Sequence, residues 1–215
     1  MKQLLYKEWR LAMHPTALLF LGLSLMLLIP NYPYYVTFFY TTLGIFFICV
    51  NGRENRDITY MMLLPIRKRD LVTARFLLIL LLEGAQVLLA IPVAMLRNNL
   101  ISAGNAVGMD ANVAFFGLAL VMLGLFNDVF LTGYYRDVNQ VGKPFVISST
   151  VIFLYMAVVE TLTHVIPFFR DRLDTKDPLF LPEKLLVLAV GLLLFALLNL
   201  LAWRRSVRSF ETQDL

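Results

Sequence analysis

The side chains best suited to chemistry are four polar groups inside long apolar stretches, Glu83, Gln86, Asp128 and Glu160. A carboxylate in hydrocarbon is costly unless it is protonated, paired or exposed to water. Gln86 follows Glu83 by three residues, so on a helix the two share one face. We predict that these residues line a translocation path or an interface between two subunits. For Glu83 the alternative is a protonated carboxyl in a structural hydrogen bond to a neighbouring helix.

The local partners of two of these acids can be predicted. We expect Asp128, late in its apolar run, to pair with Arg136 or with a lysine of the inner loops. Glu160 and His164 are four residues apart and share a helical face. We predict a local hydrogen bond between them and no metal site, because two ligands do not complete a coordination shell.

Motifs for catalysis are missing. The one Gly-Lys pair, Gly142-Lys143, is followed by Pro144, which does not fit a phosphate-binding loop. The two histidines, His14 and His164, are too far apart in sequence for a metalloprotease motif. We therefore predict that the chain is not an enzyme by itself and binds no cofactor.

The composition is that of a membrane protein. The 215 residues are 59% hydrophobic and only 16% charged, with a mean hydropathy of +0.72; soluble domains are nearer a quarter charged. In such a chain the net charge of +4 records orientation, so it does not indicate a nucleic-acid partner. We predict an all-α integral membrane protein.

The apolar runs predict one transmembrane domain over residues 1–215 with six spans. They are expected at about 16–29, 34–50, 76–96, 112–134, 145–166 and 185–203. Residues 1–13 are predicted as an interfacial helix, with Leu5 and Trp9 on its apolar face and Arg10 on its polar side. We reject a signal peptide, because no small-residue cleavage site follows the first apolar run. Gly117 and Gly124 could allow close helix packing.

The Lys and Arg residues indicate the orientation. Most of the 19 lie in the N-terminal segment, the loop 51–75, the loop 136–143 and the C-terminal tail, whereas the outer loop 167–184 is electrically balanced. Positive residues accumulate on the cytoplasmic side. Both termini are therefore predicted to be cytoplasmic.

The loop Asn51 to Arg75 is the only long charged interruption of the apolar N-terminal half. Within it Ile58, Met61, Met62 and Pro65 suit a short amphipathic helix stopped by the proline. We interpret the loop as a cytoplasmic element that docks on a partner. The alternative is an ordinary basic loop held inside by its charge.

The chain resembles the permease subunits of ABC-2 type transporters, in particular the small six-span branch that includes bacterial exporters of phenol-soluble modulin peptides. The likeness is carried by MKQLLYKEWR at the N-terminus and by ENRDITYMMLLPIRKRDLVTARF in the first inner loop. Glu54, Leu64, Pro65, Ile66, Arg67 and Arg75 fall where the family pattern places such residues.

The resemblance implies that the loop 51–75 contains a coupling helix, which rests on a separate ATP-binding subunit. The residues implied to form this interface are Glu54, Asp57, Ile58, Tyr60, Met61, Leu64, Pro65 and Arg67. It further implies two copies of the ATPase, which bind ATP and Mg, and a second permease, either a copy or a paralogue. The expected function is export of amphipathic or toxin peptides across a bacterial cytoplasmic membrane.

Two other functions remain open at this point. An ion-coupled secondary carrier would use Glu83 as its proton site and would need no ATPase. A non-transporting membrane adaptor or immunity protein would recruit partners through the loop 51–75 and would tolerate loss of Glu83.

Overall fold

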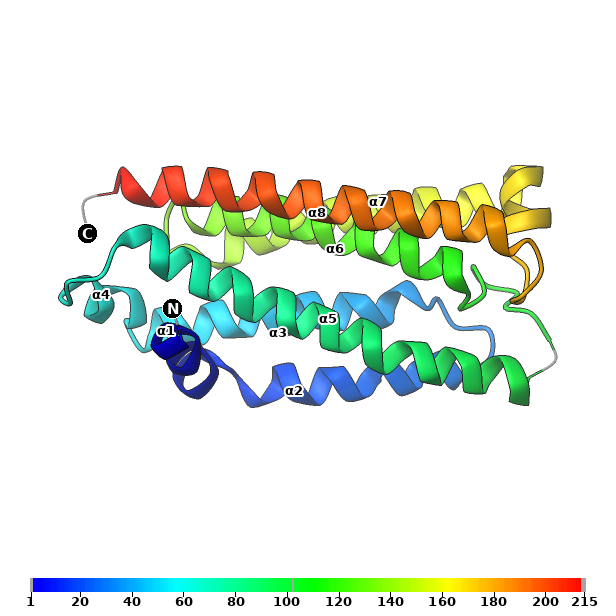
Figure 1. The fold of residues 1–215 in the computed structure, drawn as a ribbon, viewed down its shortest axis with the longest axis horizontal. Helices are drawn as coiled ribbons and strands as arrows, with labels where there is room; N and C mark the ends of the chain where they lie inside the picture. Colours follow the sequence, from blue (N-terminus) through cyan, green and yellow to red (C-terminus); the bar gives the residue numbers. More distant parts are fainter. Residues whose placement is uncertain (1, 102, 214–215) are drawn as a thin grey trace.

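The structure is a computed structural model that describes residues 2–101 and 103–213, so Met1 of the predicted interfacial helix lies outside it. The described residues form helices and loops without β-strands, arranged as an elongated bundle (Figure 1). In chain order the helices are α1 (Lys2–Lys7), a π-helical turn (Glu8–Ala12), α2 (Pro15–Leu21), a 3₁₀-helix (Gly22–Leu28), α3 (Tyr35–Glu54), α4 (Asp57–Met62), α5 (Lys68–Leu100), α6 (Val113–Tyr134), α7 (Gly142–Val165), a second π-helical turn (Phe169–Leu173) and α8 (Leu181–Glu211).

Five of the described helices, α3, α5, α6, α7 and α8, are long and apolar enough to cross a membrane. A sixth crossing is obtained if the pair Lys2–Ala12 and Pro15–Leu28 counts as one span, although the two parts are bent by 90°. Both ends of the chain lie at the same end of the bundle (Figure 1). Such an arrangement needs an even number of traverses, which favours six.

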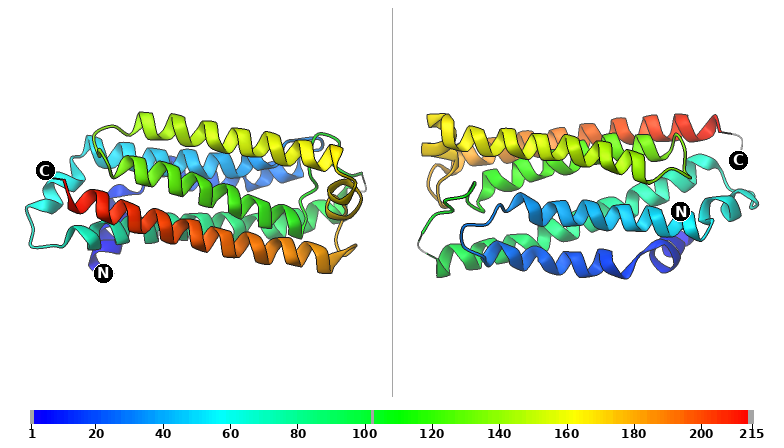
Figure 2. Two further views of the ribbon diagram at one scale, coloured as in Figure 1. Left: turned by 90° about the horizontal axis from the view of Figure 1, so that it is seen from above. Right: turned by 180° about the vertical axis from the view of Figure 1, so that it is seen from behind.

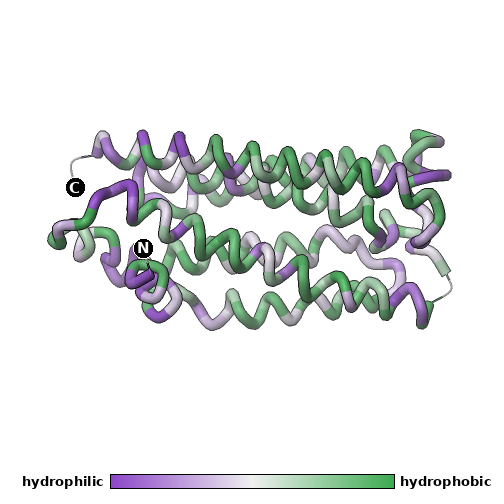
Figure 3. The backbone as a smooth tube through the Cα atoms, viewed as in Figure 1, coloured by the Kyte–Doolittle hydropathy of each residue, from purple (hydrophilic) through white to green (hydrophobic). Residues whose placement is uncertain are grey.

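Hydrophobic residues dominate the middle of the bundle, and hydrophilic residues gather at its two ends (Figure 3). The bundle is therefore an all-α integral membrane protein, as the composition predicts. Two helices extend beyond the predicted spans: α5 begins at Lys68 instead of near residue 76, and α8 continues to Glu211 through the predicted tail. Hydropathy reports where the hydrocarbon lies, whereas these helices continue into the polar region.

The first traverse, Pro15–Leu28, begins and ends differently from the others. His14 precedes it, and the His14 Nδ1 atom lies 3.3 Å from the backbone nitrogen of Thr16. Pro15 occupies the first helical position, where its missing N–H costs nothing. The second half of the traverse is the 3₁₀-helix, which rises about 2.0 Å per residue against about 1.5 Å in an α-helix.

Helix α6 lies between α7 and α8 and packs against both (Figure 2, left). Its contact with α8 is backbone to backbone: a Cβ atom on Gly191 would lie 2.8 Å from the Cα atom of Gly117. Small residues permit this approach. The buried aromatic rings of Phe115, Phe126 and Phe130 make α6 the centre of the main core.

Helix α5 crosses the bundle on the diagonal, beginning beside α8 and ending beside the 3₁₀-helix (Figure 1). At its start the Trp203 Nε1–H of α8 donates to the Thr73 hydroxyl at 3.0 Å. Further along, the Gln86 amide donates to the Ser24 hydroxyl at 3.1 Å. The two halves of α5 therefore join α8 to the N-terminal helices.

Candidate functional site

The short helix α4 lies at the end of the bundle that holds both termini (Figure 1). The preceding residue, Arg56, has φ 50° and ψ 34°, a left-handed conformation that turns the chain sharply after α3. Few non-glycine residues adopt this conformation. The turn brings Asp57, the first residue of α4, back toward the start of α5.

Four charged side chains, which we call the inner ion cluster, join four elements at this turn: α1, the π-helical turn after it, α4 and α5. The Arg75 Nη2 atom of α5 lies 2.6 Å from Asp57 Oδ2, and Arg75 Nε donates to the carboxylate of Glu8. Lys7 Nζ lies 2.6 Å from Asp57 Oδ1 and 2.8 Å from Glu8 Oε1. Two cations and two carboxylates therefore form a closed, neutral ring.

The inner ion cluster is shielded from water. Arg75 and Glu8 have side chains that are 3% exposed, and Lys7 and Asp57 are only slightly more accessible. Gly52 of α3 makes room, because a Cβ there would lie 3.2 Å from Arg75 Nη1. Buried ion pairs that lose one member are strongly destabilised. The cluster thus fixes α4 to the interfacial segment and to α5.

Helix α4 has one face on the bundle and one face exposed. Ile58 and Met61 pack against the core on the same side as Asp57. Tyr60 of α4 is 65% exposed, and Leu63 and Leu64, which directly follow the helix, are 79% and 51% exposed. We call these three residues the apolar tip.

The predicted coupling-interface residues thus divide between the two faces. Glu54, Pro65 and Arg67 are exposed, with Arg67 Nε 3.0 Å from Asp70 Oδ2. Asp57 and Met61 point into the bundle, whereas Leu63, absent from the prediction, is the most exposed residue of the apolar tip. The signal for this surface was the pair of large apolar residues Leu63 and Leu64 inside a charged loop.

Residues 2–12, predicted as an interfacial helix, form α1 and the following π-helical turn. Leu5 packs against a small core formed by Ala12, Ala17, Ile48, Leu78 and Leu82. Trp9 is 51% exposed, and Arg10 lies over the ring of Tyr6 with its guanidinium carbon 6.0 Å from the ring centre. Exposed aromatic and basic groups of this kind suit a membrane interface.

Glu83 lies inside the bundle, where it is fully buried. The Asn127 amide of α6 lies 2.9 and 3.0 Å from the two carboxyl oxygens of Glu83 and 2.9 Å from the Asn199 Oδ1 atom of α8. Gln86 bonds instead to Ser24. Asn127 therefore links Glu83 of α5 to Asn199 of α8, and Glu83 makes a hydrogen bond to a neighbouring helix, as its alternative role requires.

We expect Glu83→Gln to keep the stability of the bundle nearly unchanged, because its amide oxygen can still accept from Asn127. Asn127→Leu leaves the carboxyl without its donor and should lower the free energy of unfolding by about 1–2 kcal/mol. Heating detergent-purified variants and measuring the soluble monodisperse fraction tests both. A Glu83→Gln variant as unstable as Asn127→Leu would contradict this assignment.

The structure corrects the partner expected for Asp128, which pairs with Arg205 of α8 at 2.9 and 3.0 Å and not with Arg136. The local hydrogen bond expected between Glu160 and His164 is present: the His164 Nδ1 atom lies 2.8 Å from the backbone carbonyl oxygen of Glu160. The Glu160 carboxylate accepts from the backbone N–H of Met109 at 3.1 Å. Arg205 and Met109 come from distant segments, which helical spacing cannot reveal.

The opposite end of the bundle is closed by an ion pair and several side-chain caps that the sequence did not reveal. Arg97 is fully buried and its Nη1 atom lies 3.0 Å from Asp110 Oδ1. Asp174 accepts from the backbone N–H of Asp110 at 2.7 Å, and burial raises the pKa of the Asp174 carboxyl. Asn112 donates to the carbonyl oxygens of Leu173 and Thr175. The loops 101–112 and 166–180 are thereby tied together.

Neither end offers a metal centre in the part of the chain that the structure describes, since no three His, Cys, Asp or Glu side chains converge there.

In a comparison with protein families, residues 3–211 match the family described as ABC-2 family transporter protein. Comparisons with curated proteins and with solved structures identify no match.

Proposed function

The chain belongs to the ABC-2 family of transporter proteins, and we propose that it is the permease of an ATP-driven exporter of amphipathic peptides. Membership makes it the membrane-spanning subunit of an ABC transporter, which works with an ATP-binding subunit. The export direction, the peptide cargo and the coupling residues are our proposal.

The observation that carries the proposal is the apolar tip, which lies on α4 and on the two residues that follow it. Three exposed apolar side chains, Tyr60 of α4 and the adjoining Leu63 and Leu64, are a surface that a protein partner can bury. The inner ion cluster fixes α4 to α1 and α5. A displacement of the tip by the ATPase is therefore transmitted to the long helix α5, which crosses the bundle.

Several further features follow from this assignment. The end with α4 and both termini faces the cytoplasm, as the distribution of Lys and Arg favours. Two permeases, identical or related, enclose the path, and two ATPase subunits supply ATP and Mg. The membrane is a bacterial cytoplasmic membrane. The peptide cargo is supported by the resemblance of residues 54–76 to the small peptide-exporting permeases.

We expect Leu63→Asp with Leu64→Asp to abolish co-purification of the ATPase, because two carboxylates cannot enter an apolar docking groove without partners. Membrane insertion should remain intact, since both side chains are exposed. The measurement is the molar ratio of ATPase to permease after affinity purification in mild detergent.

The matched control is Asn139→Asp with Gln140→Glu, two exposed residues in the loop between α6 and α7, outside the tip. It adds the same charge and should keep the ATPase bound. Equal ATPase ratios in the tip variant and the control would refute the coupling role of α4. The cargo is tested separately, by ATP-dependent uptake of an amphipathic peptide into inverted vesicles.

A further inference from the structure

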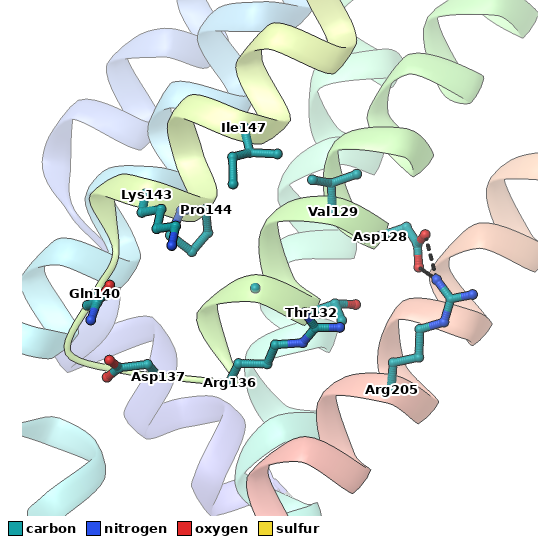
Figure 4. A pocket seen from close by; sticks show the side chains of 11 residues that line it. Asp128, Val129, Thr132, Arg136, Asp137, Gln140, Lys143, Pro144, Ile147 and Arg205 are labelled. Carbon is teal, nitrogen blue, oxygen red and sulfur yellow. Dashed lines mark hydrogen bonds and ion pairs between the residues drawn. The ribbon is translucent and has the colours of Figure 1, made fainter.

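A polar pocket of about 470 Å³ lies at the end of α6 that is shared with the termini, between α6, α7 and α8 (Figure 4). Its lining combines charged, polar and apolar groups: Asp128, Val129, Thr132, Gly133, Arg136, Asp137, Gln140, Lys143, Pro144, Ile147 and Arg205. The floor is tight, because a Cβ on Gly133 would lie 2.9 Å from Pro144 Cβ. The proposed coupling site does not include any of these residues.

The charges of the pocket leave two cations without a partner. Asp128 binds Arg205 through both carboxyl oxygens, so this pair is neutral. Asp137 accepts from the backbone N–H of Asn139 at 3.0 Å and keeps its negative charge, so two carboxylates and three cations give the pocket a net charge of +1. Among the described residues, neither Arg136 nor Lys143 has a side-chain hydrogen bond or ion pair. Figure 4 shows the Arg136 side chain extending toward Thr132, with Lys143 on the α7 side.

Thr132 provides a second, independent indication of a ligand. Its side chain lines the pocket, and its hydroxyl is covered and has no hydrogen-bond partner, so the side chain must turn about χ1 to present this donor to a ligand. Buried hydroxyls are nearly always hydrogen-bonded, because an unpaired one is destabilising. A hydroxyl donor beside two unpaired cations matches the needs of an anion with several acceptor oxygens.

The pocket lies at the depth of lipid headgroups. Measured along α6, Thr132 is roughly 28 Å from Val113, close to the thickness of the hydrocarbon layer. Val129 and Ile147 form the pocket wall on the hydrocarbon side. Leu118, Val121 and Leu125, which precede Val129 on α6 at helical spacing, are also partly exposed. This stripe gives an acyl chain an apolar surface directly below the charged groups.

We propose that this pocket binds the phosphate of an anionic phospholipid in the leaflet nearest the termini. Arg136 and Lys143 neutralise the phosphate, and the Thr132 hydroxyl donates to one of its oxygens. The acyl chains lie on the stripe Leu118, Val121 and Leu125. Basic pockets between membrane helices are suited to such headgroups, and each nearby Lys or Arg strengthens the attraction.

The test is native mass spectrometry of delipidated permease titrated with phosphatidylglycerol or with phosphatidylcholine of the same chains. The unchanged protein should retain phosphatidylglycerol in preference to phosphatidylcholine. Arg136→Gln with Lys143→Gln should weaken phosphatidylglycerol binding on the order of tenfold. Thr132→Val, which keeps the side-chain shape, should cause a smaller loss.

The matched control is Arg204→Gln with Arg208→Gln, which removes the same charge from exposed positions of α8 outside the pocket. It should leave the affinity unchanged. Equal losses in the two double variants, or equal retention of both lipids by the unchanged protein, would overturn the proposal. Competition by millimolar inorganic phosphate alone would instead identify a free anion as the ligand and would overturn the lipid assignment. Neither the lipid titration nor the phosphate competition requires the ATPase, so the outcome is independent of the proposed transport function.

Discussion

Replacing Arg75 by glutamine is expected to lower the free energy of unfolding by about 3–5 kcal/mol, the typical loss when one member of a buried ion pair is removed. The change leaves Lys7 facing both Glu8 and Asp57, so one buried carboxylate has no cation. Protein that still folds should have α4 released from α5, and its bound ATPase should hydrolyse ATP without transport. Thermal unfolding in detergent and vesicle transport measure the two effects.

Two further variants serve as a control and as a partial rescue for this prediction. Arg67→Gln removes an arginine whose side chain is 84% exposed and paired only with Asp70, and it should change stability by less than about 1 kcal/mol. Glu8→Gln combined with Arg75→Gln restores neutrality, leaving the Lys7–Asp57 pair, and should recover part of the loss. If Arg75→Gln were no more harmful than Arg67→Gln, the inner ion cluster would have no structural role.

A single methyl group on Gly191 should destabilise the bundle by about 2–3 kcal/mol or more. The new Cβ would overlap the carbonyl oxygen of Gly117 and would lie 2.7 Å from its carbonyl carbon. These atoms belong to the backbone of α6, so they cannot turn aside as a side chain would. Helices α6 and α8 would have to separate along their whole contact.

Gly84→Ala is the control for this substitution, because a Cβ on Gly84 meets no atom within 4 Å. Gly84 lies inside α5, where alanine is the better helix former by about 0.5–1 kcal/mol, so stability should stay the same or rise slightly. Heated detergent samples compared by size-exclusion chromatography give the ranking. A Gly191→Ala variant as stable as Gly84→Ala would show that α6 and α8 can move apart at little cost.

Hydropathy and charge were enough to predict the fold class and which segments share an end of the molecule. They work because hydrocarbon thickness and backbone hydrogen bonding leave an α-helical chain few alternatives. The position of α4 could also be predicted from the sequence, since Ile58, Met61 and Pro65 indicate a short amphipathic helix.

The partners of the polar residues were not predictable. Arg97 lies just after the predicted span 76–96, yet it is buried in α5, because Asp110 folds back over it. Glu8, Asp57 and Arg75 converge from three segments, and periodicity gives the face of each helix without its neighbour. Glu83 and Asn127 were each visible as polar groups in apolar runs, but nothing in the order of residues pairs them.

The unequal lengths of the traverses have a consequence for the surrounding lipid. Pro15–Leu28 spans only about 25 Å even with its 3₁₀ half, whereas the hydrocarbon layer is roughly 30 Å thick and α5 is about 50 Å long. Beside the short traverse Pro15–Leu28 the lipid bilayer must become thinner, which costs elastic energy. This cost of hydrophobic mismatch falls when the thinned regions around two permeases merge into one. Membrane elasticity alone would therefore draw the short flanks of two permeases toward each other.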